Sequence, residues 1–338
     1  MYAPGMHGRL DWAELDSAAL ASNPLGDPPR RPLLAYLPPG YEAGGRYPAV
    51  YFLHGFSGSA RGYANVTPFQ PTLPERLDAL VHAGAVPPFV GVFPDGWTRL
   101  GGSQWRDSAA TGRYGRYLAE DVVAFADARW RTVPRPGARA LVGKSSGGYG
   151  ALLHGALHPG VFGHLASHAG DAAFEYCYLP DFPRAAAALA GSDPAAWFEG
   201  FLRRARETKP AGEDHTVLNV VAMAAAYSPR AGAPLGLELP FDPDTARLRE
   251  EVWARWLEAD PVRFVPRHLD AFRRLGSVFL DCGRRDEFNL RWGARMVAEA
   301  LRQGGVDVLH EEFDDGHRGL DYRYDRSLAY LLPRMERG

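Results

Sequence analysis

The fold is decided by residues 138–153, which read ARALVGKSSGGYGALL. An apolar strand runs into the G-x-S-x-G pentapeptide Gly143–Lys144–Ser145–Ser146–Gly147, and a helix of small residues follows it and ends near Pro159. A serine on such a tight strand-to-helix turn projects its hydroxyl at the sheet edge, and the glycines prevent a clash between a Cβ and the neighbouring strand or helix. The helix N-terminus also points free N–H groups at this serine, where an oxyanion would develop. We therefore predict Ser145 as a nucleophile; the alternative is an ordinary Gly/Ser loop.

Strands and helices alternate on both sides of this turn. Apolar or alternating runs that end at turn residues predict strands at 8–15, 31–37, 48–53, 88–93, 277–281 and 306–310. Helical patterns fall at 75–82, 117–130 and 287–302. The first strand alternates polar and apolar residues and is predicted at an edge, whereas 48–53 is apolar enough to be covered on both faces. The order predicts an α/β fold, with a mostly parallel sheet and helices on both of its faces.

A different pattern fills residues 171–275. This stretch has many prolines, no convincing strands and several helical pieces, such as 194–207 and 243–257. Asp242–Pro243 and Asp260–Pro261 each place a capping acid before a proline at the first helical position. We predict that residues 1–170 and 276–338 form the α/β core and that residues 171–275 are a helical lid inserted over the carboxyl edge of the sheet. An independent second domain is the alternative.

A serine nucleophile needs a general base, which is itself oriented by an acid. In this architecture both come from turns after later strands, in the chain order serine, acid, histidine. The candidate base is His317, which lies beyond the last predicted strand between two glycines; a structural loop histidine is the alternative. The candidate acid is Asp286, after the penultimate strand, although it could also cap the next helix. Its competitors are Asp281, predicted at the strand end, and Glu287, predicted to begin that helix.

An oxyanion hole needs two N–H groups, one from the residue after the nucleophile and one from the loop after the third strand. Ser146 is the candidate for the first, and Phe56, in the loop HGFSG at 54–58, is the candidate for the second. His54 in that loop, and Gln104 and Trp105 after the fourth strand, are candidates for substrate binding. Gln104 and Trp105 fit a surface that packs against the lid equally well.

Several aromatic residues of the lid fit either an apolar acyl pocket or the packing of the lid onto the core, and we favour packing for most of them. They are Tyr176, Tyr178, Trp197, Phe198, Trp253 and Trp256.

The composition excludes some classes of partner. Among 338 residues, 38 basic and 40 acidic side chains leave a net charge of −2, so neither nucleic acid nor an anionic membrane surface is expected as a partner. No apolar run is long enough to cross a bilayer, and residues 1–16 lack the pattern of a signal peptide, which favours a cytoplasmic location. Cys177 and Cys282 are too few for a disulfide framework, and no Cys/His spacing suggests a metal. We expect no cofactor and a small-molecule ester as substrate; the sequence does not give the oligomeric state.

Five stretches resemble the esterase D, or putative esterase, group of α/β-hydrolases, in the same order along the chain. They are Tyr36–Leu37–Pro38–Pro39–Gly40–Tyr41, residues 54–58 with Leu53, Gly143 to Ala151, Asp281 to Asp286, and Gly316–His317. That group includes S-formylglutathione hydrolases, enterochelin esterases, feruloyl esterases and mycolyltransferases. The resemblance implies an α/β-hydrolase fold and serine hydrolase activity on esters or thioesters. It implies the nucleophile at Ser145, the acid at Asp286, the base at His317 and oxyanion amides at Phe56 and Ser146. Lys144 departs from the pattern, since many relatives have histidine there.

These observations favour a serine esterase that works through an acyl-serine intermediate without a cofactor. An acyltransferase would use the same triad with an alcohol in place of water, and the sequence does not separate the two. A hydrolase fold that only binds ligands is a third hypothesis, but such proteins usually lack one member of the triad.

Overall fold

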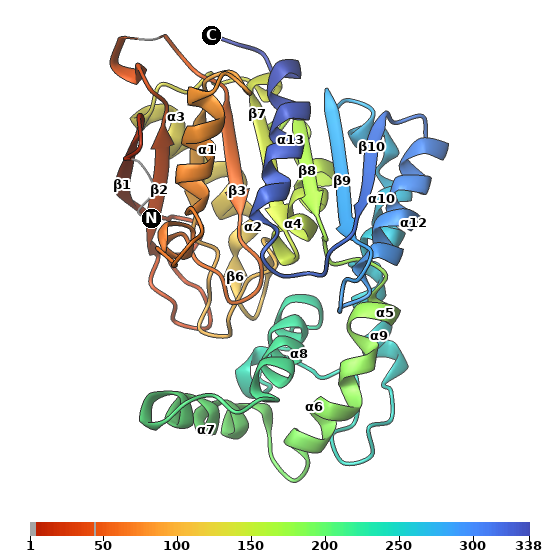
Figure 1. Ribbon diagram of the computed structural model, residues 1–338. Coiled ribbons are helices and arrows are strands. Elements are labelled where there is room, and N and C mark those ends of the chain that lie inside the picture. Colours follow the sequence, from red (N-terminus) through yellow and green to blue (C-terminus); the bar gives the residue numbers. More distant parts are fainter. Residues whose placement is uncertain (1–4, 44) are drawn as a thin grey trace.

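The computed structural model describes residues 5–43 and 45–338 as a mixed sheet between two layers of helices, with a helical cap at one end (Figure 1). The eight-stranded sheet has the order β1-β2-β4-β3-β7-β8-β9-β10. β1 and β4 each pair antiparallel with β2, and all other pairs are parallel. The strands are β1 (Arg9–Asp16), β2 (Arg30–Leu37), β3 (Ala49–Leu53), β4 (Val90–Pro94), β7 (Arg139–Lys144), β8 (His164–His168), β9 (Ser277–Gly283) and β10 (Val308–Phe313). The predicted α/β class is therefore confirmed.

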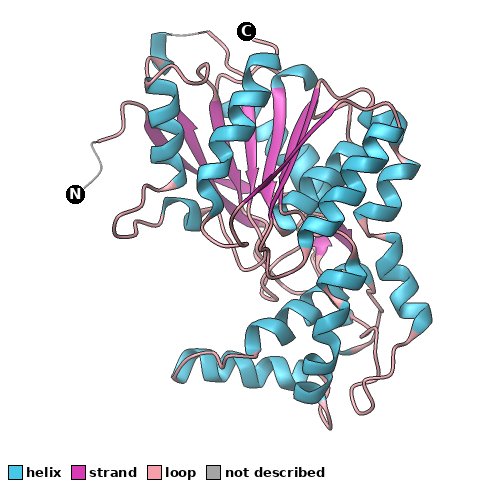
Figure 2. Ribbon diagram, turned by 45° about the vertical axis from the view of Figure 1, so that its right-hand side comes forward, coloured by secondary structure: helices cyan, strands magenta, loops and turns pink. Residues whose placement is uncertain are grey.

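Helices cover both faces of this sheet, as Figure 2 shows. On one face lie α1 (Leu73–His82) and α13 (Arg323–Leu331), packed on Val50 and Phe52 of β3. On the other face lie α3 (Val123–Arg129), α4 (Ser146–Leu157) and α12 (Leu290–Gln303), packed on residues such as Tyr51 and Leu280. Because successive strand residues point to opposite faces, the apolar run of β3 is buried on both sides.

The remaining core elements are short. α2 (Tyr114–Arg116) continues through a π-helical turn, Tyr117–Val122, into α3, so the predicted helix at 117–130 exists but is irregular. A small hairpin joins β5 (Asp107–Ser108) to β6 (Gly112–Arg113). Single 3₁₀ turns occur at Tyr41–Ala43, Arg61–Ala64, Pro136–Ala138, Leu179–Asp181, Pro234–Gly236, Leu320–Tyr322 and Leu332–Arg334.

All the helices between β8 and β9 belong to one helical segment, of which α6 to α9 stand below the sheet in Figure 1. The helices are α5 (Phe174–Cys177), α6 (Phe182–Leu189), α7 (Pro194–Glu207), α8 (Asp214–Tyr227), α9 (Glu250–Glu258), α10 (Pro261–Arg267) and α11 (Leu269–Phe272). We refer to residues 171–275 as the cap. Its last two helices, α10 and α11, pack directly on α4 of the core.

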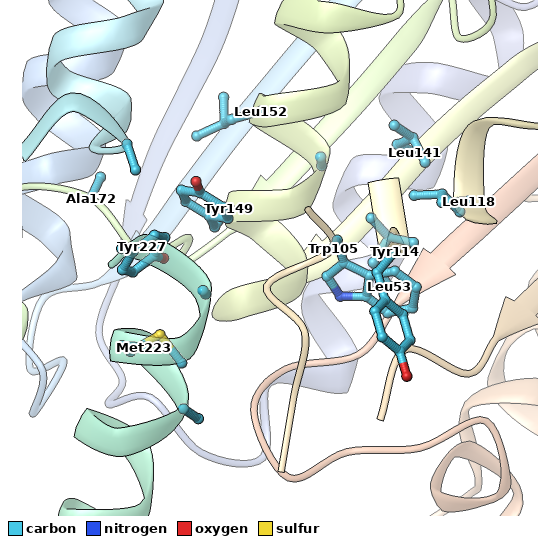
Figure 3. Close-up of a cluster of buried hydrophobic side chains, with 14 of the residues drawn as sticks. Leu53, Trp105, Tyr114, Leu118, Leu141, Tyr149, Leu152, Ala172, Met223 and Tyr227 are labelled. Carbon is cyan, nitrogen blue, oxygen red and sulfur yellow. The ribbon is translucent and has the colours of Figure 1, made fainter. Parts of the chain in front are cut away.

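The cap shares its apolar interior with the core. Tyr149 on α4 lies beside Tyr227 on α8, with 5.8 Å between the ring centroids (Figure 3). Phe174 of α5 completes the contact, with its ring 5.1 Å from that of Tyr227. All three rings are buried, so a single layer of aromatic side chains joins the cap to the helix that follows Ser145.

The prediction of a helix at 243–257 is wrong in its first half. α9 begins only at Glu250, because Asp242 caps a local turn rather than a helix. Its Oδ1 accepts hydrogen bonds from the backbone N–H groups of Asp244 and Thr245 and from the hydroxyl of Thr245. Asp260, by contrast, is the N-cap of α10, as predicted, and accepts from the N–H of Val262 at 3.0 Å.

Candidate active site

Ser145 stands between β7 and α4 in a backbone conformation that side chains rarely adopt, with φ 57° and ψ −124°. Such a conformation costs about 1–3 kcal/mol and persists only where the surroundings hold it. Here the Ser145 N–H donates to the carbonyl of His168 on β8 at 2.9 Å, and α4 begins at the next residue. The turn thus places the hydroxyl at the N-terminus of α4.

Two glycines make this turn possible. A Cβ on Gly143 would lie 2.2 Å from the carbonyl oxygen of Gly147, and a Cβ on Gly147 would lie 1.9 Å from that of Leu53. Neither contact is sterically allowed, so the first and last glycines of the pentapeptide let β7 and α4 approach each other and β3. Gly55 has a similar role beside the serine, since a Cβ there would lie 3.2 Å from the Ser145 Cβ.

His317 lies in the loop after β10 and is hydrogen-bonded to Asp286, the residue predicted as its acid. The distance from His317 Nδ1 to Asp286 Oδ2 is 2.8 Å, and both side chains are buried. Asp286 Oδ1 accepts from the backbone N–H groups of Phe288 and Leu290 at 2.9 and 3.3 Å. Burial and the charge of Asp286 raise the pKa of the Cys282 thiol, which donates to Asp286 Oδ2 at 3.6 Å. The carboxylate is therefore held in one orientation, with its charge directed at the imidazole.

The two competing acids have other partners. Asp281 belongs to β9, as predicted, two residues before the strand ends, and pairs with His168 at 2.7 Å and Arg323 at 2.8 Å. Glu287 does not begin a helix, because α12 starts at Leu290; its carboxylate accepts from the backbone N–H of His317 at 2.7 Å. Glu287 thus fixes the loop that carries the histidine, whereas Asp286 contacts the ring itself.

A second Asp-His-Ser array lies inside the core. His168 joins Asp281 to Ser327, with Nε2 2.9 Å from Ser327 Oγ. All three residues are at most 1% exposed. A substrate cannot reach this array, so its geometry alone does not make it a site.

Ser145 and His317 instead line a common cavity of about 410 Å³ between the sheet edge and the cap. Its walls are formed by Gly55, Phe56, Ser57, Gly58, Lys144, Ser145, Ser146, Asp171, Cys177, Tyr178, His215, Asn219, Phe288, Leu290, His317 and Arg318. The candidate nucleophile, the candidate base and both candidate oxyanion residues therefore face one space. This shared cavity distinguishes Ser145 and His317 from the buried array of Asp281, His168 and Ser327.

Asp171 is a carboxylate in this cavity that sequence reasoning missed. It follows β8, and its Oδ1 accepts from the Ser145 hydroxyl at 3.3 Å. Its Oδ2 accepts from Ser146 Oγ at 3.1 Å and from Tyr178 at 2.8 Å. No hydrogen bond joins Ser145 Oγ to His317 in the described part of the chain; such contacts often form only when substrate binds. Recognising β8 in the sequence would have placed Asp171 at the same sheet edge as Ser145.

The three residues predicted to bind substrate lie behind the cavity wall. His54 is buried, with Nε2 accepting from the Gly96 N–H at 2.9 Å, and burial lowers its pKa. Trp105 donates from its indole to the His54 carbonyl. Gln104 reaches Asp171 and the Tyr178 hydroxyl, at 3.1 and 3.0 Å, and so supports two residues that do line the cavity.

Most aromatic residues of the cap serve packing. Trp256, Phe198 and Trp253 are buried, and only Tyr178 reaches the cavity. Tyr176 is 47% exposed on the outside of α5. Further cavity residues that the sequence did not reveal, such as His215 and Asn219, come from α8, whose position depends on the packing of the cap.

Three properties of the described residues bear on metals, membranes and disulfides. Among residues 5–43 and 45–338, no group of three His, Cys, Asp or Glu side chains is arranged to hold a metal ion. None of the helices in the same ranges has the length and apolar character needed to span a bilayer. Both cysteines, Cys177 and Cys282, are free and buried.

Comparisons with known proteins bear on the family and on the fold. A family model described as putative esterase matches residues 28–323. No curated protein matches the sequence. Similar solved structures include a ferulic acid esterase, with 18% identity, a TM-score of 0.63, and coverage of 98% of this chain and 100% of the other. The S-formylglutathione hydrolase of Agrobacterium tumefaciens has 16% identity, a TM-score of 0.58 and coverage of 98% of both chains. A fluorophosphonate-binding serine hydrolase of Staphylococcus aureus has 11% identity, a TM-score of 0.59, and coverage of 96% and 98%. At these identities the solved structures show a common fold.

Proposed function

The chain belongs to the putative esterase family and is a carboxylic ester hydrolase, and from this premise we propose that it cleaves esters or thioesters through an acyl-serine intermediate. In this proposal Ser145 is the nucleophile, His317 the general base and Asp286 the orienting acid. The observation that carries it is the shared cavity, which is lined by Ser145 and by a histidine hydrogen-bonded to a buried carboxylate.

In the first half of the reaction, Ser145 Oγ attacks the carbonyl carbon of the ester while His317 Nε2 takes the hydroxyl proton. His317 Nδ1–H donates to Asp286 at 2.8 Å, which leaves Nε2 as the free base and stabilises the imidazolium that forms. The backbone N–H groups of Phe56 and Ser146 accommodate the oxyanion, helped by the positive end of the α4 dipole. His317 then gives its proton to the leaving alcohol or thiol, and the carbon–oxygen or carbon–sulfur bond breaks.

In the second half, water replaces the departed group. His317 takes a proton from water, whose oxygen attacks the acyl-serine to form a second tetrahedral intermediate. As this intermediate collapses, His317 returns the proton to Ser145 Oγ, the acyl carbon–Oγ bond breaks, and the carboxylic acid and free Ser145 are released. No step requires a cofactor. An alcohol in place of water would give acyl transfer, which product analysis with added alcohol distinguishes.

Replacement of Ser145 tests the proposal. Ser145→Ala is expected to lower kcat by about 10⁶-fold on a para-nitrophenyl ester, because the members of a triad act as a unit. A fluorophosphonate probe is expected to label the wild-type chain on the peptide that contains Ser145, and mass spectrometry of the digest locates the adduct.

The buried array supplies a matched control. Ser327→Ala removes the serine of the second Asp-His-Ser set and is expected to keep kcat within a few-fold while lowering the free energy of unfolding by about 1 kcal/mol. Circular dichroism confirms that each variant is folded. Substantial activity or labelling in folded Ser145→Ala would overturn the proposed nucleophile.

A further inference from the structure

Three basic side chains from separate elements converge on the cavity. Lys144 ends β7, Arg318 follows the proposed base in the loop after β10, and His215 lies on α8 of the cap. They are close enough to influence one another, since the charge of Arg318 contributes to lowering the pKa values of both Lys144 and His215, in which burial is the larger cause. We call Lys144 and Arg318, the two cations among them, the cation pair.

Neither member of the cation pair forms an ion pair with a carboxylate among residues 5–43 and 45–338. In the part of the chain that the structure describes, neither side chain forms a hydrogen bond, although Lys144 is half-buried; Arg318 is exposed. Asp286 and Glu287, which act on Lys144 through their charges, are already hydrogen-bonded to the ring and backbone of His317. Asp321 also acts on Lys144 but lies beyond ion-pair distance.

Lysine is rare in this chain. The chain has only two lysines, Lys144 and Lys209, among its 38 basic residues. A half-buried ammonium with no hydrogen-bond acceptor loses hydration. The charges of Asp321, Asp286 and Glu287 compensate only part of this loss, since burial still lowers the pKa of Lys144 overall. An anion that enters the cavity would restore the lost interaction, so the cation pair is suited to an anionic part of the substrate.

The position of the cation pair indicates which part of the ester carries the anion. The leaving group must lie near His317, because this residue protonates it, and Arg318 is the next residue in the chain. The acyl oxygen faces Phe56 and Ser146, and beside Ser146 lies the carboxylate of Asp171, which would repel a second anion. Charge thus favours an anion on the leaving group over one near Asp171.

We propose that Lys144 and Arg318 bind a carboxylate on the alcohol or thiol part of the substrate, so that the enzyme prefers esters whose leaving group is an acid. This inference rests on the function proposed above. Asn219, one helical turn after His215 on α8, lines the same cavity and can add a neutral donor.

A matched pair of substrates tests this preference. para-Acetoxybenzoate carries a carboxylate on its leaving group, and its methyl ester carries none while keeping the same acyl group. We expect the ratio of kcat/KM for the acid to that for the methyl ester to fall roughly tenfold in Lys144→Met and in Arg318→Gln, mainly through KM, as for a partly exposed charge-assisted contact. Arg318→Lys, which keeps the charge, is expected to retain most of the ratio.

The second lysine gives the control. Lys209→Met removes the same charge from an exposed position after α7 and is expected to leave the ratio unchanged. Added salt is expected to raise KM for the acid more than for the methyl ester in the wild type, because salt screens a charge contact. The salt measurement needs no variant. Because Arg318 is exposed, Arg318→Gln is expected to leave the stability of the fold unchanged.

The outcomes separate this inference from the proposed function. If Ser145→Ala abolishes hydrolysis but the ratio is the same in wild type, Lys144→Met and Arg318→Gln, the carboxylate preference is wrong and the esterase mechanism stands. If Ser145→Ala retains hydrolysis of both substrates, the proposed mechanism itself is wrong. If Lys144→Met affects the mono-para-nitrophenyl ester of succinic acid but not para-acetoxybenzoate, the carboxylate belongs to the acyl part, which overturns the placement proposed here.

Discussion

Two carboxylates contact the candidate site. Asp171 is hydrogen-bonded to Ser145, and Asp286 is hydrogen-bonded to His317. Asp286 holds the imidazole of His317 and is itself held by two backbone N–H groups. Asp171 contacts the hydroxyls of Ser145, Ser146 and Tyr178 but has no hydrogen bond to His317 among the described residues. From these contacts we propose that Asp286 orients the candidate base and that Asp171 organises the serine side of the cavity.

Replacing each acid by its amide tests this distinction. Asp286→Asn is expected to lower kcat by about 10⁴-fold, because an amide cannot stabilise the imidazolium and favours the wrong tautomer of His317. Asp171→Asn is expected to cost less than about tenfold, because its amide oxygen still accepts from Ser146 and Tyr178. Steady-state kinetics on a neutral ester decides the matter. A loss in Asp171→Asn as large as that in Asp286→Asn would make Asp171 the acid of the triad.

Residues of the site differ in how visible they are in the sequence. Ser145 lies in a pattern with strong local geometry, and His317 and Asp286 follow strands in the expected order, so local patterns are enough to predict all three as candidates. Asp171, His215 and Asn219 carry no such pattern, since their position depends on how residues far apart in the chain pack. Glu287 was predicted at a helix start because an acid suits a helix N-terminus, but its hydrogen bond to the backbone of His317 is a contact across 30 residues.

At the scale of elements, two identical dipeptides behave differently. Asp260–Pro261 begins α10, whereas Asp242–Pro243 lies in a turn. The carboxylate of Asp260 is fully buried and accepts from the N–H groups of Ala173 and Phe174, both at 2.9 Å, as well as from its own helix. It therefore ties the start of α5 to α10, which packs on the core. The side chain of Asp242 is 39% exposed and serves only its own loop.

Alanine at these two positions is expected to separate the two roles. Asp260→Ala should lower the free energy of unfolding by about 3 kcal/mol, because it leaves several buried backbone donors without an acceptor. Asp242→Ala should cost below about 1 kcal/mol, as for an exposed cap. Urea unfolding followed by circular dichroism measures both. Equal losses would show that Asp260 has no role beyond that of a local cap.

For the whole molecule, the central question is whether the cap is a separate domain. The buried rings of Phe174, Tyr227 and Trp256 from the cap form one apolar cluster with Tyr149 of the core. The hydrogen bonds from Gln104 to Tyr178 and Tyr227 cross the same boundary, at 3.0 and 2.9 Å. We propose that the cap and the core, residues 171–275 against 1–170 and 276–338, depend on each other for stability.

Cooperative unfolding would test this dependence. Urea titration is expected to give a single transition, with the same midpoint for tryptophan fluorescence and for circular dichroism. Tyr227→Ala should shift that one transition by about 3 kcal/mol because it empties a buried aromatic site. Tyr176→Ala, at a position on the same cap that is 47% exposed, should shift it by below about 1 kcal/mol. Two separate transitions, with only the first sensitive to Tyr227→Ala, would indicate an independent cap domain.

Local patterns in the sequence are enough to predict the turn at Ser145, the order of the candidate triad and every strand of the large sheet except β8. These follow from short-range physics: apolar periodicity sets strands and helices, and the steric demand for glycine at 143 and 147 marks the turn. Which space this serine faces depends instead on tertiary packing. The carboxylate of Asp171, the cation pair and the α8 residues reach the cavity from strand ends and helices whose relative placement depends on burial of a common aromatic layer, and no local pattern in the chain records that placement.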